Sequence, residues 1–209
     1  MIDFYFDNKH GVLKNKLNII DCEESKAAER YYFEAGFKEL QRKNDFSAEP
    51  EYMCHVHNVL YNPLYTWAGK YRLIDIERSE LTLKGLSLQY ETYKKIDCSV
   101  KSVFRYMKDI RLRDLSMDEK LDQIVTIIIN LWHIHPFRDC NTRSLIAFIY
   151  QYCSSDSLVL DYNLLINNLE YFRTSLVAAS FKDELIDVYP NRSYITGIME
   201  DAFKENYKH

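Results

Sequence analysis

Apolar residues recur every three or four positions along most of the chain, which is the pattern of helices with one buried face. The first such stretch follows Asp21, a residue type that caps helix N-termini, and extends to about Arg42. A second begins at Pro50 and is ended by Asn62 and Pro63. The later predicted helices are residues 86–109, 118–134, 141–154, 161–182 and 192–206. The pattern therefore predicts an all-α protein.

One stretch departs from helical spacing. Between Lys70 and Leu83 apolar and polar residues alternate irregularly, with a polar tip at Glu77–Glu80, and this predicts a short β-hairpin. It is the only strand signal in the sequence. Residues 1–22 show no regular periodicity and are expected to be irregular. Without repeats or low-complexity linkers, residues 1–209 are expected to form one domain, with its C-terminal helix at about 192–206.

Two strongly apolar stretches flank a short polar segment. Residues 124–132 have almost no polar face, and residues 144–153 resume an apolar helical pattern. Pro136 cannot continue a helix and disfavours helical backbone before it, so the first helix should end near His135. The residues that favour the start of the next helix are Asp139, Asn141 and Thr142. The sequence therefore predicts a tight polar loop between two buried helices.

Composition and charge narrow the possible partners. A net charge of −4 argues against nucleic acid as the main partner, because phosphate contacts need a basic surface. The five cysteines are scattered and odd in number, which indicates free thiols in a reducing compartment. No secretion signal is visible, and the longest apolar run, residues 124–134, is too short to span a bilayer. We therefore expect a soluble cytoplasmic protein without a membrane partner.

The predicted loop gathers groups that suit phosphate chemistry. The N–H groups at a helix N-terminus lack partners and bind anions. Arg138 and Arg143 would add phosphate donors, and Asp139 adds a carboxylate oxygen of the kind that Mg²⁺ prefers. His135 has a side chain whose ordinary pKa lies near neutrality, so it can act as a base. These groups, within nine residues, predict a site for phosphate-transfer chemistry.

The segment His135–Arg143 resembles the signature of Fic-domain proteins, H-x-F-x-[D/E]-G-N-[G/K]-R. The matching positions are His135, Phe137, Asp139, Asn141 and Arg143. Cys140 and Thr142 stand where glycine, and glycine or lysine, are usual. Ile146 stands where many members have a second arginine.

Two further stretches, residues 13–17 and Trp67–Arg72, resemble motifs of the same family, so the resemblance covers roughly residues 12–205. It implies the Fic fold, a single-domain helical bundle with a short β-hairpin flap beside the active-site loop. The flap would dock a target segment by strand addition. The residues of this implied flap are Arg72, Leu73, Ile74, Asp75 and Ile76.

The resemblance also implies a reaction, the transfer of AMP from ATP, with Mg²⁺, to a Ser, Thr or Tyr hydroxyl of a target protein. His135 would be the general base, and Asp139 would hold Mg²⁺, although a helix cap is the simpler role for this carboxylate. Asn141 and Arg143 would bind the phosphates of the donor. Cys140 and Thr142 also belong to the donor-binding loop, and their side chains should narrow it.

Other interpretations stay open. A zinc site at His133 and His135 lacks the paired ligand spacing of structural zinc sites, and so does one at residues 54–57. The altered loop and missing second arginine favour two alternatives within the same fold. One is an enzyme with another donor, such as UTP, CDP-choline, or ATP used for phosphate transfer. The other is a weakly active regulatory or interaction module. An antitoxin partner and self-association are also open.

Many Fic proteins carry an inhibitory helix, [S/T]-x-x-x-E-[G/N], whose glutamate pairs with the second arginine. Glu29, within Ser25–Arg30, and Glu205 both match this pattern imperfectly. Because Ile146 replaces the usual partner, a buried glutamate there would lack its counter-charge, and we expect no ordinary clamp of this kind. If a residue does inhibit, Glu205 is the better candidate, with Arg143 as its partner.

Overall fold

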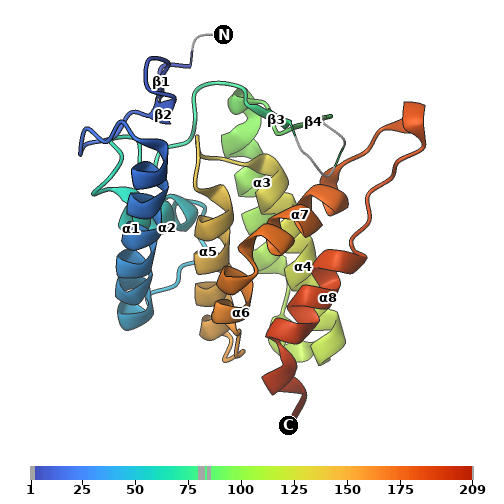
Figure 1. Ribbon diagram of the computed structural model, residues 1–209. Coiled ribbons are helices and arrows are strands. Elements are labelled where there is room, and N and C mark those ends of the chain that lie inside the picture. Colours follow the sequence, from blue (N-terminus) through green and yellow to red (C-terminus); the bar gives the residue numbers. More distant parts are fainter. Residues whose placement is uncertain (1–2, 80–82, 84–85, 209) are drawn as a thin grey trace.

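Eight α-helices make up most of the structure, a computed structural model that describes residues 3–79, 83 and 86–208 (Figure 1). They are α1 (Cys22–Lys43), α2 (Glu51–Tyr61), α3 (Ile96–Asp109), α4 (Met117–Ile134), α5 (Asn141–Ser155), α6 (Tyr162–Asn167), α7 (Leu169–Ser180) and α8 (Ser193–Ala202). Helices α1, α2, α4 and α5 begin and end within one or two residues of the predicted limits. The prediction of an all-α fold is confirmed.

Helices α4 and α5 lie at the centre of the bundle (Figure 1). Helix α5 packs against α1 and α2, while α4 packs against α3, α7 and α8. Ser116 and Glu119 start α4 with a capping box, in which each side chain accepts from the other residue's backbone N–H. Most apolar side chains of α4 and α5 are buried, so both ends of the loop between them are held by the core. In the described part of the chain, no helix is long and apolar enough to cross a membrane.

Two small antiparallel hairpins accompany the helices, both at the same end of the bundle (Figure 1). Strand β1 (Phe6–Asp7) pairs with β2 (Val12–Leu13), so the prediction of an irregular N-terminal segment is wrong at these positions. Strand β3 (Glu77–Ser79) pairs with β4 (Ser87–Gln89).

The second hairpin lies later in the chain than predicted. Residues 70–76 form no strand, because their polar groups bond elsewhere. The Arg72 N–H donates to the Pro136 carbonyl in the polar loop (2.9 Å), and Ile74 is buried in the core. Glu80, expected at the hairpin tip, lies outside the described residues.

Three predicted helices also differ from the structure. The helix predicted from residue 86 begins only at Ile96, because β4 and a 3₁₀ turn come first. The long helix predicted through Asn168 divides there into α6 and α7, where the side chain and the backbone N–H of Asn168 both donate to the Leu164 carbonyl (2.8 and 3.1 Å). The C-terminal helix ends at Ala202, and a 3₁₀ turn follows.

The side chain of Arg72 is buried against the end of α4, with 1% of its surface exposed. Its Nε donates to the His135 carbonyl (2.9 Å), and its Nη2 donates to the Ile134 carbonyl (3.3 Å). Its remaining donors bond to the carbonyls of Ile74 and Glu91. Arg72 therefore satisfies carbonyls that the end of a helix leaves unpaired and ties two other segments to it. Its expected place on a target-docking flap is wrong.

Replacing Arg72 with leucine should destabilise the protein strongly. The variant leaves several buried carbonyls without donors, and each such loss costs about 1–3 kcal/mol, so we expect the free energy of unfolding to fall by about 3 kcal/mol or more. Urea unfolding of wild type and Arg72→Leu measures the difference. Arg113→Leu, at a side chain with 81% exposure, is the control and should unfold within about 0.5 kcal/mol of wild type. Equal losses in both variants would contradict the role of Arg72.

Candidate active site

The loop between α4 and α5 has a left-handed residue at each end. His135 has φ 48° at the C-terminus of α4, and Cys140 has φ 62° at the N-cap of α5. Such backbone favours glycine, which is the usual residue of the signature at position 140. The Asn141 side chain closes the loop, since it accepts from the Phe137 N–H and donates to the Phe137 carbonyl, both at 2.9 Å. The side chain of Asn141 thus holds the loop closed. This leaves the backbone N–H of Asn141 for the phosphate binding that the sequence predicts for this residue.

His135 is held as a neutral base. Its Nδ1–H donates to the Trp132 carbonyl (3.1 Å), because a carbonyl can only accept, and this assigns the lone pair of the ring to Nε2. Tyr90 stacks on the imidazole with ring centres 3.8 Å apart, and Trp132 meets it edge-on. Burial, and then the nearby charge of Arg78, hold the pKa of His135 well below its usual value. The residue is therefore uncharged and able to accept a proton at neutral pH.

A second buried histidine, His57 on α2, positions the loop. Its Nδ1 accepts from the Gly69 N–H (2.9 Å), and its Nε2–H donates to the Asp139 carbonyl (3.3 Å). Its ring stacks on Phe137, with centres 3.9 Å apart. Gly69 has φ +73°, and a Cβ there would lie 2.7 Å from the Asn58 Cβ, so only glycine fits this approach. Because both ring nitrogens are bonded, His57 has none left for a metal at residues 54–57.

Asp139 is bonded from two sides. Arg78 of β3 donates to both carboxylate oxygens at 3.0 Å, and the Cys140 N–H donates to Oδ1 at 2.7 Å. The carboxylate thus links the second hairpin to the start of α5. Mg²⁺ commonly takes one or two carboxylates and completes its shell with phosphate and water oxygens, so this single carboxylate fits the ion together with a phosphate ligand. With the ion bound, Arg78 would either share the Asp139 carboxylate with it or lose its hydrogen bonds to this carboxylate.

A cavity of about 120 Å³ opens between the loop and α7. Its lining residues are Arg78, His135, Asp139, Cys140, Asn141, Thr142, Arg143, Leu169, Glu170 and Arg173. The structure therefore brings the base, the carboxylate and the start of α5 together, as the sequence predicts. Arg78 and Arg173 also line it, although no spacing in the sequence relates them to the loop. The helix N-terminus and three arginines give it the character of an anion site.

Arg143 faces a glutamate of α1. Its Nη1 lies 3.8 Å from Glu29, whose other carboxylate oxygen accepts from the Tyr65 hydroxyl (2.6 Å). Burial, and then the charge of Asp139, raise the pKa of Glu29, while Tyr65 and Arg143 oppose that rise. The sequence leaves Arg143 as the one motif arginine that could meet a glutamate, and the structure places Glu29, rather than the preferred Glu205, beside it.

Glu205 does not lie at this site. Its neighbour Asn206 bonds with Val159, just beyond the C-terminal end of α5, whereas Arg143 is in the first turn of that helix. The two ends of this helix are on the order of 20 Å apart. The preference for Glu205 as the inhibitory residue is therefore wrong.

The remaining predicted loop residues have structural contacts. Thr142 accepts a hydrogen bond from the Trp132 indole N–H (3.2 Å), so its hydroxyl is tied to α4. The Cys140 thiol is buried, and burial raises its pKa well above the usual value, so it stays protonated.

The segment expected to form the flap is arranged unevenly. Ile74 is buried and Ile76 half-buried, while Leu73 is 63% exposed. Asp75 is exposed and accepts from the Tyr93 N–H (2.8 Å). No strand lies within residues 72–76, and β3, which follows this segment, has the extended backbone that strand addition needs.

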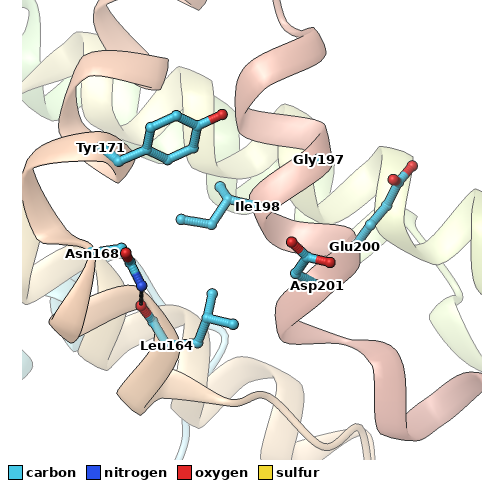
Figure 2. A pocket seen from close by; sticks show the side chains of 7 residues that line it. All are labelled: Leu164, Asn168, Tyr171, Gly197, Ile198, Glu200 and Asp201. Carbon is cyan, nitrogen blue, oxygen red and sulfur yellow. Dashed lines mark hydrogen bonds between the residues drawn. The ribbon is translucent and has the colours of Figure 1, made fainter.

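A larger cavity, of about 580 Å³, lies between α6 and α7 on one side and α8 on the other (Figure 2). The Tyr171 ring and Ile198 lie across it, and Glu200 and Asp201 project from α8. Its lining contains carboxylates and no basic side chain, so it does not suit a phosphate ligand.

Comparison with known proteins identifies the family. Residues 47–153, just over half of the chain, match the family model described as "Fic/DOC family". The chain belongs to the Fic/DOC family. It is 28% identical over 167 residues to a protein adenylyltransferase, VbhT, of Bartonella schoenbuchensis, with 77% of this chain and 33% of that protein covered. The chain thus spans about a third of the length of this curated relative.

Solved structures show the same Fic fold. The N-terminal Fic domain of Bep8, a VirB-translocated effector of Bartonella sp. 1-1C, has a TM-score of 0.81 at 17% identity, with 95% of this chain and 94% of that chain covered. BepC of Bartonella tribocorum, with bound AMPPNP, has a TM-score of 0.77 at 17% identity and 95% coverage of both chains. The signature loop, which the sequence assigns to this family, is the loop described above.

The buried state of His57 should appear in the pH dependence of stability. Burial lowers its pKa to about 3, against about 6.5 in the unfolded chain, so the stability it contributes is present above pH 6.5 and is lost as the pH falls towards 3. In His57→Gln, whose amide can replace both hydrogen bonds, this loss is absent. Between pH 6 and 4, wild type should lose about 1.4 kcal/mol more per pH unit than the variant. Urea unfolding across this range measures the free energy of unfolding of both proteins against pH. Equal slopes for wild type and His57→Gln would show that His57 is not buried in the neutral form.

Proposed function

We propose that the protein is a Fic-type protein adenylyltransferase, which transfers AMP from ATP to a hydroxyl of a target protein. The observation that carries the proposal is His135, a buried and neutral base beside a helix N-terminus and an acid suited to Mg²⁺. The name of the relative VbhT and the AMPPNP bound to BepC support a nucleotide donor of this kind.

The residues divide the chemistry between them. Nε2 of His135 takes the proton from the attacking Ser, Thr or Tyr hydroxyl, whose oxygen forms a bond to the α-phosphorus of ATP. The bond from that phosphorus to the bridging oxygen breaks, and pyrophosphate leaves. The first N–H groups of α5 and the Arg143 guanidinium stabilise the charge on the phosphates. Asp139 would hold Mg²⁺, which supplies further charge neutralisation on the phosphate oxygens.

The target segment would lie along β3, whose backbone is extended and whose Arg78 reaches the loop. Main-chain pairing gives affinity without demanding one sequence, so the acceptor hydroxyl rather than the surrounding residues decides what reacts. A protein with an exposed loop carrying Ser, Thr or Tyr fits this geometry.

A different donor is the second candidate. Ile146, buried in the core, stands where many Fic proteins have a second arginine, and Cys140 and Thr142 stand where glycine, and glycine or lysine, are usual. UTP, CDP-choline, or ATP used for phosphate transfer would be compatible with the same base. Mass analysis of a modified target distinguishes these groups by their different masses.

Transfer should depend on His135. We expect His135→Ala to lower the rate of labelling of the protein itself or a target by ATP at least 100-fold, since a positioned general base contributes about 10²–10⁴. The assay uses ATP labelled in the α-phosphate, with Mg²⁺. His133→Ala, two residues earlier on α4, is the matched control and should keep near-wild-type labelling. Equal labelling by wild type and His135→Ala would exclude the proposed reaction.

Glu29 should restrain this reaction. Its carboxylate lies against Arg143 and would repel donor phosphates from the guanidinium. Glu29→Gln keeps a polar partner for Tyr65 but removes the charge, and we expect automodification to rise at least tenfold, which is about 1.4 kcal/mol of relieved inhibition. Glu205→Gln, far from the loop, is the control and should not change the rate. An unchanged rate in Glu29→Gln would show that the pair is structural only.

A further inference from the structure

Ile146 leaves the donor site with one arginine from α5. Its side chain is buried, with 1% of its surface exposed, and packs in the apolar core, so this position contributes no charge to the cavity. The remaining arginine of that helix, Arg143, is already opposed by Glu29. A donor with two or three phosphates carries several negative charges, and the loop alone would meet them with few cations.

Helix α7 supplies another cation at the same cavity. Arg173 lines it together with His135 and Arg143, and its side chain is largely buried, with 21% exposed. Its charge lowers the pKa of His135, with a smaller effect than burial, Arg78 or Arg72. The cavity wall thus carries three arginines against two acids, Asp139 and Glu170.

The ion pair of Arg173 with Glu170 is long, and its acid is exposed to solvent. The two residues are one turn apart on α7, their closest atoms are 3.8 Å apart, and the glutamate side chain is 84% exposed. A pair with such an exposed acid contributes about 0.2–1 kcal/mol, so a phosphate can compete for the guanidinium. Arginine binds phosphate oxygens in a forked geometry that such a pair does not use.

We infer that Arg173 binds the donor's phosphates beyond the one attached to the ribose, in place of the second arginine that Ile146 replaces. The inference rests on the proposed function and makes it more specific. It assigns to this residue the selection of nucleoside diphosphates and triphosphates over monophosphates. The cation comes from α7 rather than from the signature helix.

Calorimetry with ADP and AMP, both with Mg²⁺, tests this selection. Arg173→Gln should weaken ADP binding at least tenfold and AMP binding less than twofold, because AMP has no phosphate at the proposed position. Arg173→Lys, which keeps a cation but not the fork, should fall between wild type and Arg173→Gln. Arg105→Gln, the same charge change at an exposed position of α3, is the matched control and should bind both nucleotides as wild type does.

The outcomes separate the inference from the function on which it rests. Unchanged ADP binding in Arg173→Gln overturns the inference alone, and so does an equal loss for ADP and AMP, which would mark a structural role. Wild type that binds neither nucleotide overturns the inference and the proposed function together. With ATP as donor, Arg173→Gln should raise KM at least tenfold while kcat falls less than threefold, and the opposite split also contradicts the inference.

Discussion

The guanidinium of Arg72 lies inside the protein, where its charge is met by backbone carbonyls and by Asp75 at 3.9 Å. Removing a charge from water costs several kcal/mol, and hydrogen bonds to most of its donors offset this loss. Two of those carbonyls close α4, at the residues where the backbone turns left-handed into the loop. The others belong to the segments before β3 and α3. This one side chain therefore holds the loop residue His135 to the two segments that flank the hairpin, alongside the Arg78–Asp139 pair.

The parts of the fold that could be predicted are those set by local chemistry. The apolar stretches of α4 and α5 fix two buried helices, and Pro136 with the cap residues fixes the loop between them. His135 and Asp139 lie in that loop, nine residues or fewer from Arg143, so sequence proximity already brings them to one cavity. A short signature was therefore enough to find the base and the carboxylate.

The other features of the fold and of the site depend on contacts between distant segments, and the periodicity of apolar residues does not predict such contacts. Apolar and polar residues alternate in residues 70–76 as in a strand. Arg72, however, bonds to the His135 carbonyl in the loop, and the strand begins only at Glu77. Arg173 lines the cavity from α7, a helix that begins after the break at Asn168, which the sequence does not predict. Glu29 and Glu205 both match the inhibitory pattern imperfectly, and it is the packing of α1 on α5 that places Glu29 beside Arg143.

Nη2 of Arg78 donates to both carboxylate oxygens of Asp139, and this ion pair connects two parts of the site. Arg78 belongs to the hairpin along which a second chain could pair, while Asp139 belongs to the loop that would meet a cation. Since one carboxylate cannot serve both partners fully, a cation that displaced Arg78 would also remove this bond between the hairpin and the loop. By linkage, a ligand that draws Arg78 away must favour the cation by the same factor. Binding of a chain at the hairpin and binding of a cation at the loop would thereby be coupled through a single side chain.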